Sequence, residues 1–96
     1  MIKIGNKRLG DVGEYCGRPS PLGNPYRVGE WLRDRACDAY EAWFTIRVVR
    51  GDFVIMAELH RLQQIHRERG ELTLLCFCYP HRCHCETIKR WLEANP

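Results

Sequence analysis

The strongest strand signal in the chain is the segment Leu72-Thr73-Leu74-Leu75-Cys76-Phe77-Cys78. It is almost continuously apolar, a pattern typical of a strand that is covered on both faces. Pro80 is expected to end this strand, because proline has no N–H to donate to a neighbouring strand. A final helix is expected to begin near Arg82 or Cys83. The apolar side of this helix consists of Ile88, Trp91 and Leu92.

Two helices are expected before this strand. The first runs from Glu30 to about Val49, and the second follows Asp52 and runs to about Arg69. Gly51 and Gly70 are expected to end them, and the Asp52 carboxylate can cap the second helix. The predicted inward stripe of the first helix is Leu32, Ala36, Ala39, Tyr40, Trp43 and Ile46. The stripe of the second is Ile55, Met56, Leu59, Leu62 and Ile65.

Two short strands are expected near the start of the chain, from Ile2 to Ile4 and from Glu14 to Gly17. The order of elements is then strand, strand, helix, helix, strand, helix. This order predicts an α/β fold in which helices pack on a short sheet. Residues 1–96 are expected to form a single small domain, because a domain usually needs about 100 residues to build a core.

Composition narrows the class of protein. With 45% hydrophobic and 28% charged residues the chain is globular, and no apolar run approaches the roughly 18 residues of a membrane span. The first residues lack the apolar region of a signal peptide, so we expect a cytoplasmic protein with reduced cysteines. The net charge of +3 is too small to indicate nucleic-acid binding. Twelve of the fifteen basic residues are arginine, which suits phosphate or carboxylate, although codon usage in a GC-rich genome explains it equally well.

The densest group of reactive side chains is Cys76-Phe77-Cys78-Tyr79-Pro80-His81-Arg82-Cys83-His84-Cys85. It lies where the last strand ends and the last helix begins, which is the usual ligand crevice of α/β sheets. One interpretation is a zinc site formed by Cys76, Cys78, Cys83 and His84. Against it, Cys-x-Cys on a strand differs from the usual zinc-knuckle spacing. Cys83 and Cys85 would also point to opposite sides of a helix.

Two further interpretations of this group remain open. In one, it forms a polar pocket with Cys83 as nucleophile and His84 as general acid or base, because a helix start lowers the pKa of a thiol. In the other, Cys76 and Cys78 are small buried hydrophobes and His84 forms a hydrogen bond at the start of the helix. Whether the protein is an enzyme stays undecided at this point. The two remaining cysteines are expected to be structural: Cys16 and Cys37.

A second candidate segment is Gly17-Arg18-Pro19-Ser20-Pro21-Leu22-Gly23-Asn24-Pro25, whose prolines and glycines indicate a loop. It matches neither a Walker loop nor a dinucleotide fingerprint. Arg18 and Ser20 suit a phosphate or carboxylate, and Asn24 could bind a base or ribose edge. Gly23 lets backbone N–H groups approach a ligand closely. The alternative is a rigid connector that covers the edge of the sheet.

Both segments resemble the signatures of a known family. Residues 17–26 resemble "GRPSPLGNPF", with Tyr26 in place of the phenylalanine. Residues 76–84 resemble the pattern cysteine-aromatic-cysteine-x-proline-x-x-cysteine-histidine. Through these two segments the chain resembles, over nearly its whole length, a small uncharacterised family found in phages and bacteria. This family is called domain of unknown function four-three-two-six. Small residues are usual there at the position of Cys85. The resemblance implies a phage or bacterial cytoplasmic protein and no particular activity.

We expect the two segments to converge on one polar pocket that binds a small phosphate-bearing ligand, such as a nucleotide or nucleic-acid fragment. Arg18 would neutralise the anion, Asn24 would orient it, and the start of the last helix would complete the site. One alternative is a non-enzymatic zinc module that supports protein or nucleic-acid interactions. Another is a phage protein that inhibits a host factor. A homodimer is compatible with so small a domain.

Overall fold

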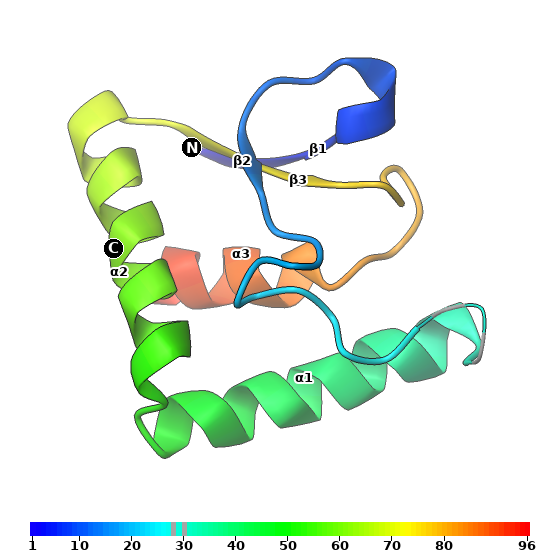
Figure 1. The fold of residues 1–96 in the computed structure, drawn as a ribbon. Coiled ribbons are helices and arrows are strands. Elements are labelled where there is room, and N and C mark those ends of the chain that lie inside the picture. Colours follow the sequence, from blue (N-terminus) through cyan, green and yellow to red (C-terminus); the bar gives the residue numbers. More distant parts are fainter. Residues whose placement is uncertain (28, 30) are drawn as a thin grey trace.

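The computed structural model describes residues 1–27, 29 and 31–96. Figure 1 shows a short sheet with α3 directly beneath it and α1 farther away on the same side. The predicted α/β class and the predicted order of elements are confirmed. The elements are β1 (Ile2–Asn6), the 3-10 turn η1 (Lys7–Leu9), β2 (Glu14–Tyr15), α1 (Arg33–Val49), α2 (Phe53–Arg69), β3 (Leu72–Cys76) and α3 (Cys85–Ala94).

The three strands are parallel, and β3 lies between β1 and β2. Ile2 pairs with Leu72 at the start of the β1–β3 ladder, and Tyr15 pairs with Leu75 in the β2–β3 ladder. Because the strands are parallel, their carboxyl ends lie at the same edge of the sheet. The segments that follow β2 and β3 therefore begin side by side, although about 60 residues separate them in the chain.

The central strand is buried on both faces, as its apolar sequence predicts. Leu72, Leu74 and Cys76 belong to the core that the helices cover. Leu75, which alternation places on the opposite face, is only 4% exposed. The strand ends at Cys76 and does not reach Cys78. After the strand ends, the backbone N–H groups of Cys78 and Tyr79 donate hydrogen bonds to the sulfur of Cys76 and not to a neighbouring strand.

Three other predicted boundaries were wrong. β1 continues to Asn6, past the predicted end at Ile4. β2 ends at Tyr15, not at Gly17, because the chain turns there and Ser20 N donates to the carbonyl oxygen of Gly17 at 2.8 Å. α3 begins at Cys85, not at Arg82 or Cys83. The Glu86 carboxylate accepts a hydrogen bond from the backbone N–H of Cys83 at 3.2 Å. This contact holds Cys83 just ahead of the helix.

The inward face of α1 is narrower than predicted. Its buried residues are Ala36, Cys37, Tyr40 and Phe44. Leu32 and Ile46 are 71% and 51% exposed, because α1 packs against the rest of the domain along one side only. Trp43 is half-buried and packs against the core as predicted, and it also lines a shallow groove. Glu30, the predicted start of this helix, lies outside the described residues, and the described helix begins at Arg33.

The second helix follows its prediction closely. Asp52 caps it by accepting a hydrogen bond from the backbone N–H of Ile55 at 3.1 Å. Gly51 and Gly70, at the ends of the two helices, have φ of 67° and 73°, which suits glycine. All five predicted inward residues pack in or against the core: Ile55, Met56, Leu59, Leu62 and Ile65.

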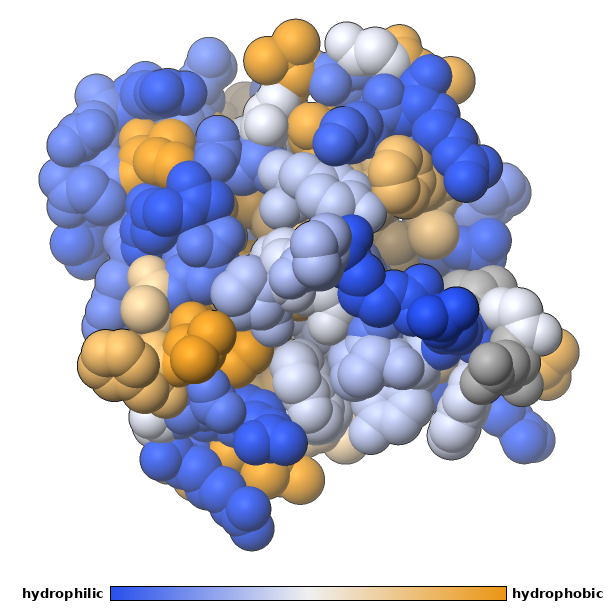
Figure 2. Space-filling model, in the orientation of Figure 1, coloured by the Kyte–Doolittle hydropathy of each residue, from blue (hydrophilic) through white to orange (hydrophobic). Residues whose placement is uncertain are grey.

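The face of the molecule seen in Figure 2 is mostly hydrophilic, with small apolar areas that include the corner between α1 and α2. Val49 and Phe53 at this corner are 81% and 85% exposed. Among the described residues, none of the helices has the length and apolar character that a membrane crossing requires.

Candidate functional site

A pocket of about 710 Å³ opens at the carboxyl edge of the sheet. Its walls come from the loop after β2, the start of α1 and the segment between β3 and α3. The two segments that the sequence singled out both contribute to it, which confirms that they converge. The contributing residues are Gly17, Arg18 and Asn24 from the first and Cys76, Phe77, Cys78, Arg82, Cys83 and His84 from the second.

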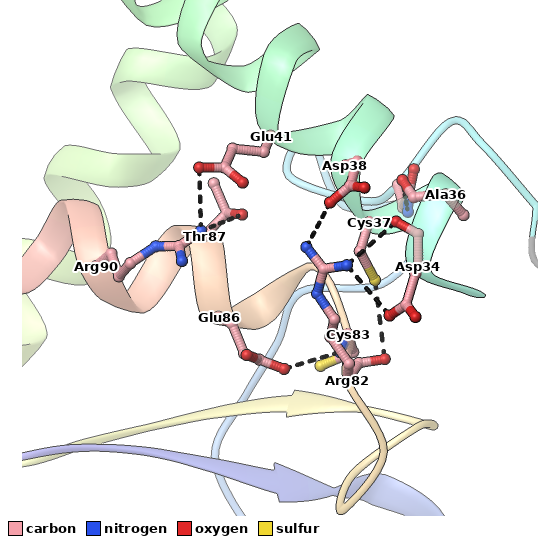
Figure 3. Close-up of polar contacts among 11 residues, drawn as sticks. Asp34, Ala36, Cys37, Asp38, Glu41, Arg82, Cys83, Glu86, Thr87 and Arg90 are labelled. Carbon is pink, nitrogen blue, oxygen red and sulfur yellow. Dashed lines mark hydrogen bonds and ion pairs between the residues drawn. The ribbon is translucent and has the colours of Figure 1, made fainter. Parts of the chain in front are cut away.

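Four arginines line the pocket: Arg18, Arg27, Arg33 and Arg82. Arg82 is engaged, because its guanidinium pairs with Asp34 at 3.2 Å and with Asp38 at 2.7 Å (Figure 3). Arg33 donates to the carbonyl oxygen of Arg82 at 3.3 Å. These bonds attach the segment after β3 to α1. Within the described part of the chain, no ion pair involves Arg18, Arg27 or Arg33.

The predicted ligand-binding residues divide into two groups. Arg18 and Asn24 line the pocket, whereas Ser20 and Gly23 do not. The Ser20 hydroxyl instead accepts a hydrogen bond from the backbone N–H of Leu22 at 3.2 Å. Gly23 lies against the backbone of Arg18, and a Cβ there would come within 2.8 Å of the Arg18 nitrogen. Ser20 and Gly23 therefore shape the loop that presents Arg18.

Asn24 also has a structural role. Its Oδ1 accepts a hydrogen bond from the backbone N–H of Tyr26 at 2.8 Å. Its Nδ2 donates to the carbonyl oxygen of Ala36 at 3.4 Å, which joins the loop to α1. These two bonds use part of the hydrogen-bonding capacity of the Asn24 amide. A ligand can bind only to the part that they leave free.

A group of three buried thiols lies beside the pocket, and two of them, Cys76 and Cys83, line it. The sulfur atoms of Cys76, Cys83 and Cys85 are all within 4.8 Å of one another, and this group could hold a metal ion. The Cys76 and Cys83 sulfurs are 3.1 Å apart. The Cys76 sulfur also accepts hydrogen bonds from the backbone N–H groups of Cys78 and Tyr79, both at 3.4 Å.

Hydrogen bonds among these thiols separate their pKa values. The hydrogen bond with Cys83 is the largest cause that lowers the pKa of the Cys76 thiol, and the neighbouring Cys85 thiol lowers it further. The same bond with Cys76 raises the pKa of Cys83. The neighbouring side chain of Cys16 is the largest cause of the raised pKa of Cys85. Negative charge in this group therefore collects on Cys76.

The structure brings together two of the four predicted zinc ligands. Of Cys76, Cys78, Cys83 and His84, only Cys76 and Cys83 belong to the group found among the described residues, and Cys85 joins them. Cys78 falls beyond the end of β3, so strand alternation does not place it beside Cys76. Cys83 precedes α3 and Cys85 is its first residue, so the rule that separates them around a helix does not apply.

The His84 ring hydrogen-bonds with the backbone of Cys16. Its Nε2 lies 2.7 Å from the carbonyl oxygen of Cys16, so this nitrogen carries the donated proton. The ring packs edge-on against Tyr40, with the centroids 5.0 Å apart. Burial lowers the pKa of His84. The neutral imidazole therefore has Nδ1 as its basic atom.

The predicted lowering of the Cys83 pKa was wrong. α3 begins two residues after Cys83, and the hydrogen bond with Cys76 raises the pKa of Cys83 instead. The catalytic roles of Cys83 and His84 stay predictions, with both residues in the pocket wall.

Sequence reasoning missed several residues of the pocket. Tyr15 and Phe77 line it, with ring centroids 5.4 Å apart, and both stand at the carboxyl ends of neighbouring strands. Arg33 and Cys37 reach it from the first turns of α1, one helical turn apart. Cys37, expected to be structural, is buried, and its sulfur donates to the carbonyl oxygen of Arg82 at 3.8 Å. The parallel order of strands would have been needed to locate these residues.

Comparison with known proteins gives one match. A family model described as "Domain of unknown function (DUF4326)" matches residues 3–94. No curated protein and no solved structure matches the chain. Since the family model spans almost the whole chain, this protein belongs to the DUF4326 family of domains of unknown function.

Proposed function

We propose that the pocket binds a small phosphate-bearing ligand, either a nucleotide or a nucleic-acid fragment. The observation that carries this proposal is the convergence of Arg18, Arg27 and Arg33 on the carboxyl edge of a parallel sheet. Guanidinium groups bind phosphate through paired hydrogen bonds, and this edge is the usual ligand position in α/β sheets. The volume of about 710 Å³ suits a small molecule, for which pockets of about 300–1,000 Å³ are typical.

Aromatic side chains favour a nucleotide over inorganic phosphate. Tyr15, Tyr26 and Phe77 line the same pocket as the arginines. Rings of this kind provide apolar faces on which a base can stack. The hydroxyl of Tyr15 donates to the carbonyl oxygen of Arg18 at 3.0 Å, so an aromatic wall and a phosphate-binding side chain are held together.

Calorimetric titration of the full chain tests this proposal, with inorganic phosphate, nucleoside mono-, di- and triphosphates and short oligonucleotides as ligands. Arg18→Ala is expected to weaken binding of the best ligand by about 10- to 150-fold, because a hydrogen bond to a charged group contributes about 1.5–3 kcal/mol.

Arg69→Ala is the matched control, because it removes one positive charge from the exposed end of α2. This variant is expected to bind as the wild type does. The proposal is refuted if the wild type binds none of these ligands, or if Arg18→Ala and Arg69→Ala bind equally well.

A second candidate function is a non-enzymatic zinc-binding module, which the thiol group favours. Three buried cysteine side chains lie within reach of one ion, and cysteine is the most common ligand of structural zinc. Elemental analysis of protein purified without added metal tests this candidate. About one zinc per chain is expected if it is correct, and folded protein that contains no zinc contradicts it.

A further inference from the structure

We infer that the pocket holds one nucleotide of a single-stranded nucleic acid, and that the next nucleotides of the strand lie in a groove along α1. This inference rests on the proposed nucleotide-binding function and names the class of ligand. The groove, which we call the α1 groove, has a volume of about 400 Å³. Its lining combines small or aliphatic residues of α1 with aromatic and arginine side chains, namely Tyr26, Trp31, Trp43, Arg47 and Arg50.

Tyr26 connects the pocket with the α1 groove, because it lines both of them. Its ring contacts Trp31 edge-on, with the ring centroids 5.3 Å apart. The backbone N–H of Trp31 donates to the carbonyl oxygen of Arg27 at 2.9 Å, and the Arg27 side chain lines the pocket. A ligand that extends past Tyr26 therefore leaves the pocket and enters the α1 groove.

The two tryptophans of the α1 groove favour a nucleic acid with unpaired bases. Trp31 is 41% exposed, and Trp43 is half-buried. Bases stack on aromatic side chains of this kind, whatever their sequence, because every base has a flat π-face. In a duplex these faces are covered by the neighbouring base pairs, whereas a single strand can present them. The expected occupant is therefore a single strand.

Positive charge accompanies the aromatic side chains along this path. Arg47 pairs with Asp52 at 3.4 Å and lies over the ring of Trp43, with its guanidinium carbon 5.8 Å from the centroid. Arg50 is exposed, and no ion pair involves it among the residues that the structure describes. Among the described residues that line the α1 groove, none is acidic. This charge complements a strand that carries one phosphate per nucleotide.

The length of α1 sets the length of strand that can be bound. Arg33 lines the pocket and Arg47 lines the α1 groove, so the helix separates them by about 21 Å at about 1.5 Å per residue. At a stacked spacing of about 3.4 Å per nucleotide this distance holds about six nucleotides, and an extended strand fills it with fewer. Affinity is therefore expected to rise with strand length up to about six nucleotides and then to stay level.

Titration of the full chain with ligands of increasing length tests the inference. The ligands are a nucleoside monophosphate, single strands of the same base as DNA and as RNA, and a duplex. Calorimetry measures the affinities, and quenching of tryptophan fluorescence reports stacking. A strand of about six nucleotides is expected to bind at least about 10-fold more tightly than the monophosphate, since each base stacked on an aromatic side chain contributes about 5- to 150-fold. The duplex is expected to bind more weakly than the single strand.

Variants of the tryptophans locate the strand. Trp31→Ala and Trp43→Ala are each expected to lower the ratio of oligonucleotide affinity to monophosphate affinity by about 5- to 150-fold. Trp31 is exposed, so its variant is informative even if Trp43→Ala does not fold. Trp91→Ala is the matched control. Trp91 packs against the core as Trp43 does, but it is not among the described residues that line the pocket or the α1 groove. It is expected to keep the wild-type ratio.

The dependence of affinity on salt tests the phosphate contacts separately. Each phosphate contact of a single strand adds about 0.7 to the slope of log affinity against log salt concentration. Arg50→Ala is therefore expected to lower this slope by about 0.7 for the oligonucleotide. Arg69→Ala, at the exposed end of α2, is expected to keep the wild-type slope.

Three results would overturn the inference. They are an oligonucleotide that binds no more tightly than the monophosphate, a duplex that binds as tightly as the single strand, and a Trp31→Ala ratio equal to that of Trp91→Ala. Each of them leaves the nucleotide pocket standing, provided that the monophosphate binds and that Arg18→Ala weakens its binding. A wild-type chain that binds neither the monophosphate nor any strand refutes the proposed function itself, and the inference with it.

Discussion

Replacing Tyr40 with phenylalanine tests how the loop after β2 is held against α1. Tyr40 is completely buried, and its hydroxyl donates a 2.8 Å hydrogen bond to the carbonyl oxygen of Leu22. The substitution keeps the ring and its packing against Phe44 and His84. It leaves the Leu22 carbonyl oxygen buried without that partner, which costs about 1–3 kcal/mol. The free energy of unfolding is therefore expected to fall by this amount.

Urea unfolding followed by tryptophan fluorescence measures the loss. In a domain of this size a loss of 1 kcal/mol lowers Tm by about 4–8 °C, so a thermal scan gives an independent value. Tyr79→Phe is the control, because Tyr79 is 44% exposed and the loss of its hydroxyl is expected to change stability by less than about 0.5 kcal/mol. If Tyr40→Phe is no more destabilising than this control, the hydroxyl does not hold the loop.

The same variant links the loop to ligand binding. Leu22 lies between Arg18 and Asn24, so a loosened loop presents both side chains less rigidly. The ligand must then order the loop when it binds, and this cost lowers the affinity. Tyr40→Phe is expected to weaken nucleotide binding, and less so than Arg18→Ala, in the same calorimetric titration.

Three further changes test the local contacts. Gly23→Ala is expected to destabilise the fold by about 1–3 kcal/mol in urea unfolding, because the added Cβ would lie 2.8 Å from the Arg18 nitrogen; unchanged stability would show that the loop can yield. Asp52→Ala removes the carboxylate that accepts a hydrogen bond from the Ile55 N–H. The same assay is expected to show a fall of about 0.5–2 kcal/mol in the free energy of unfolding, and Asp52→Asn is expected to recover most of this loss. Iodoacetamide is expected to alkylate Cys78 first in the folded chain, since it is the one cysteine of the six that is not buried; peptide mapping that finds another cysteine labelled first contradicts the burial pattern.

Part of the candidate site was predictable from sequence and part was not. The proline-rich loop and the cysteine-rich segment each stand out by composition, and their convergence could be anticipated because both follow strands. Arg33 gave no such signal, because one arginine at the start of a helix resembles any exposed arginine. Cys85 was set aside by a rule for helix interiors, although it is the first residue of α3 and its sulfur lies with those of Cys76 and Cys83.

Local sequence patterns were enough to place the elements. The apolar run at Leu72, the cap at Asp52 and the glycine at Gly70 act through neighbouring residues, and those neighbours are known once the order of residues is known. The parallel pairing of β2 with β3 is different, because it depends on a register between segments about 60 residues apart. That register sets Cys16 beside Cys76 and brings Arg18 into the wall of the pocket. Contacts of this kind arise when the whole chain buries its apolar faces together, so they belong to the folded protein and not to any one stretch of it.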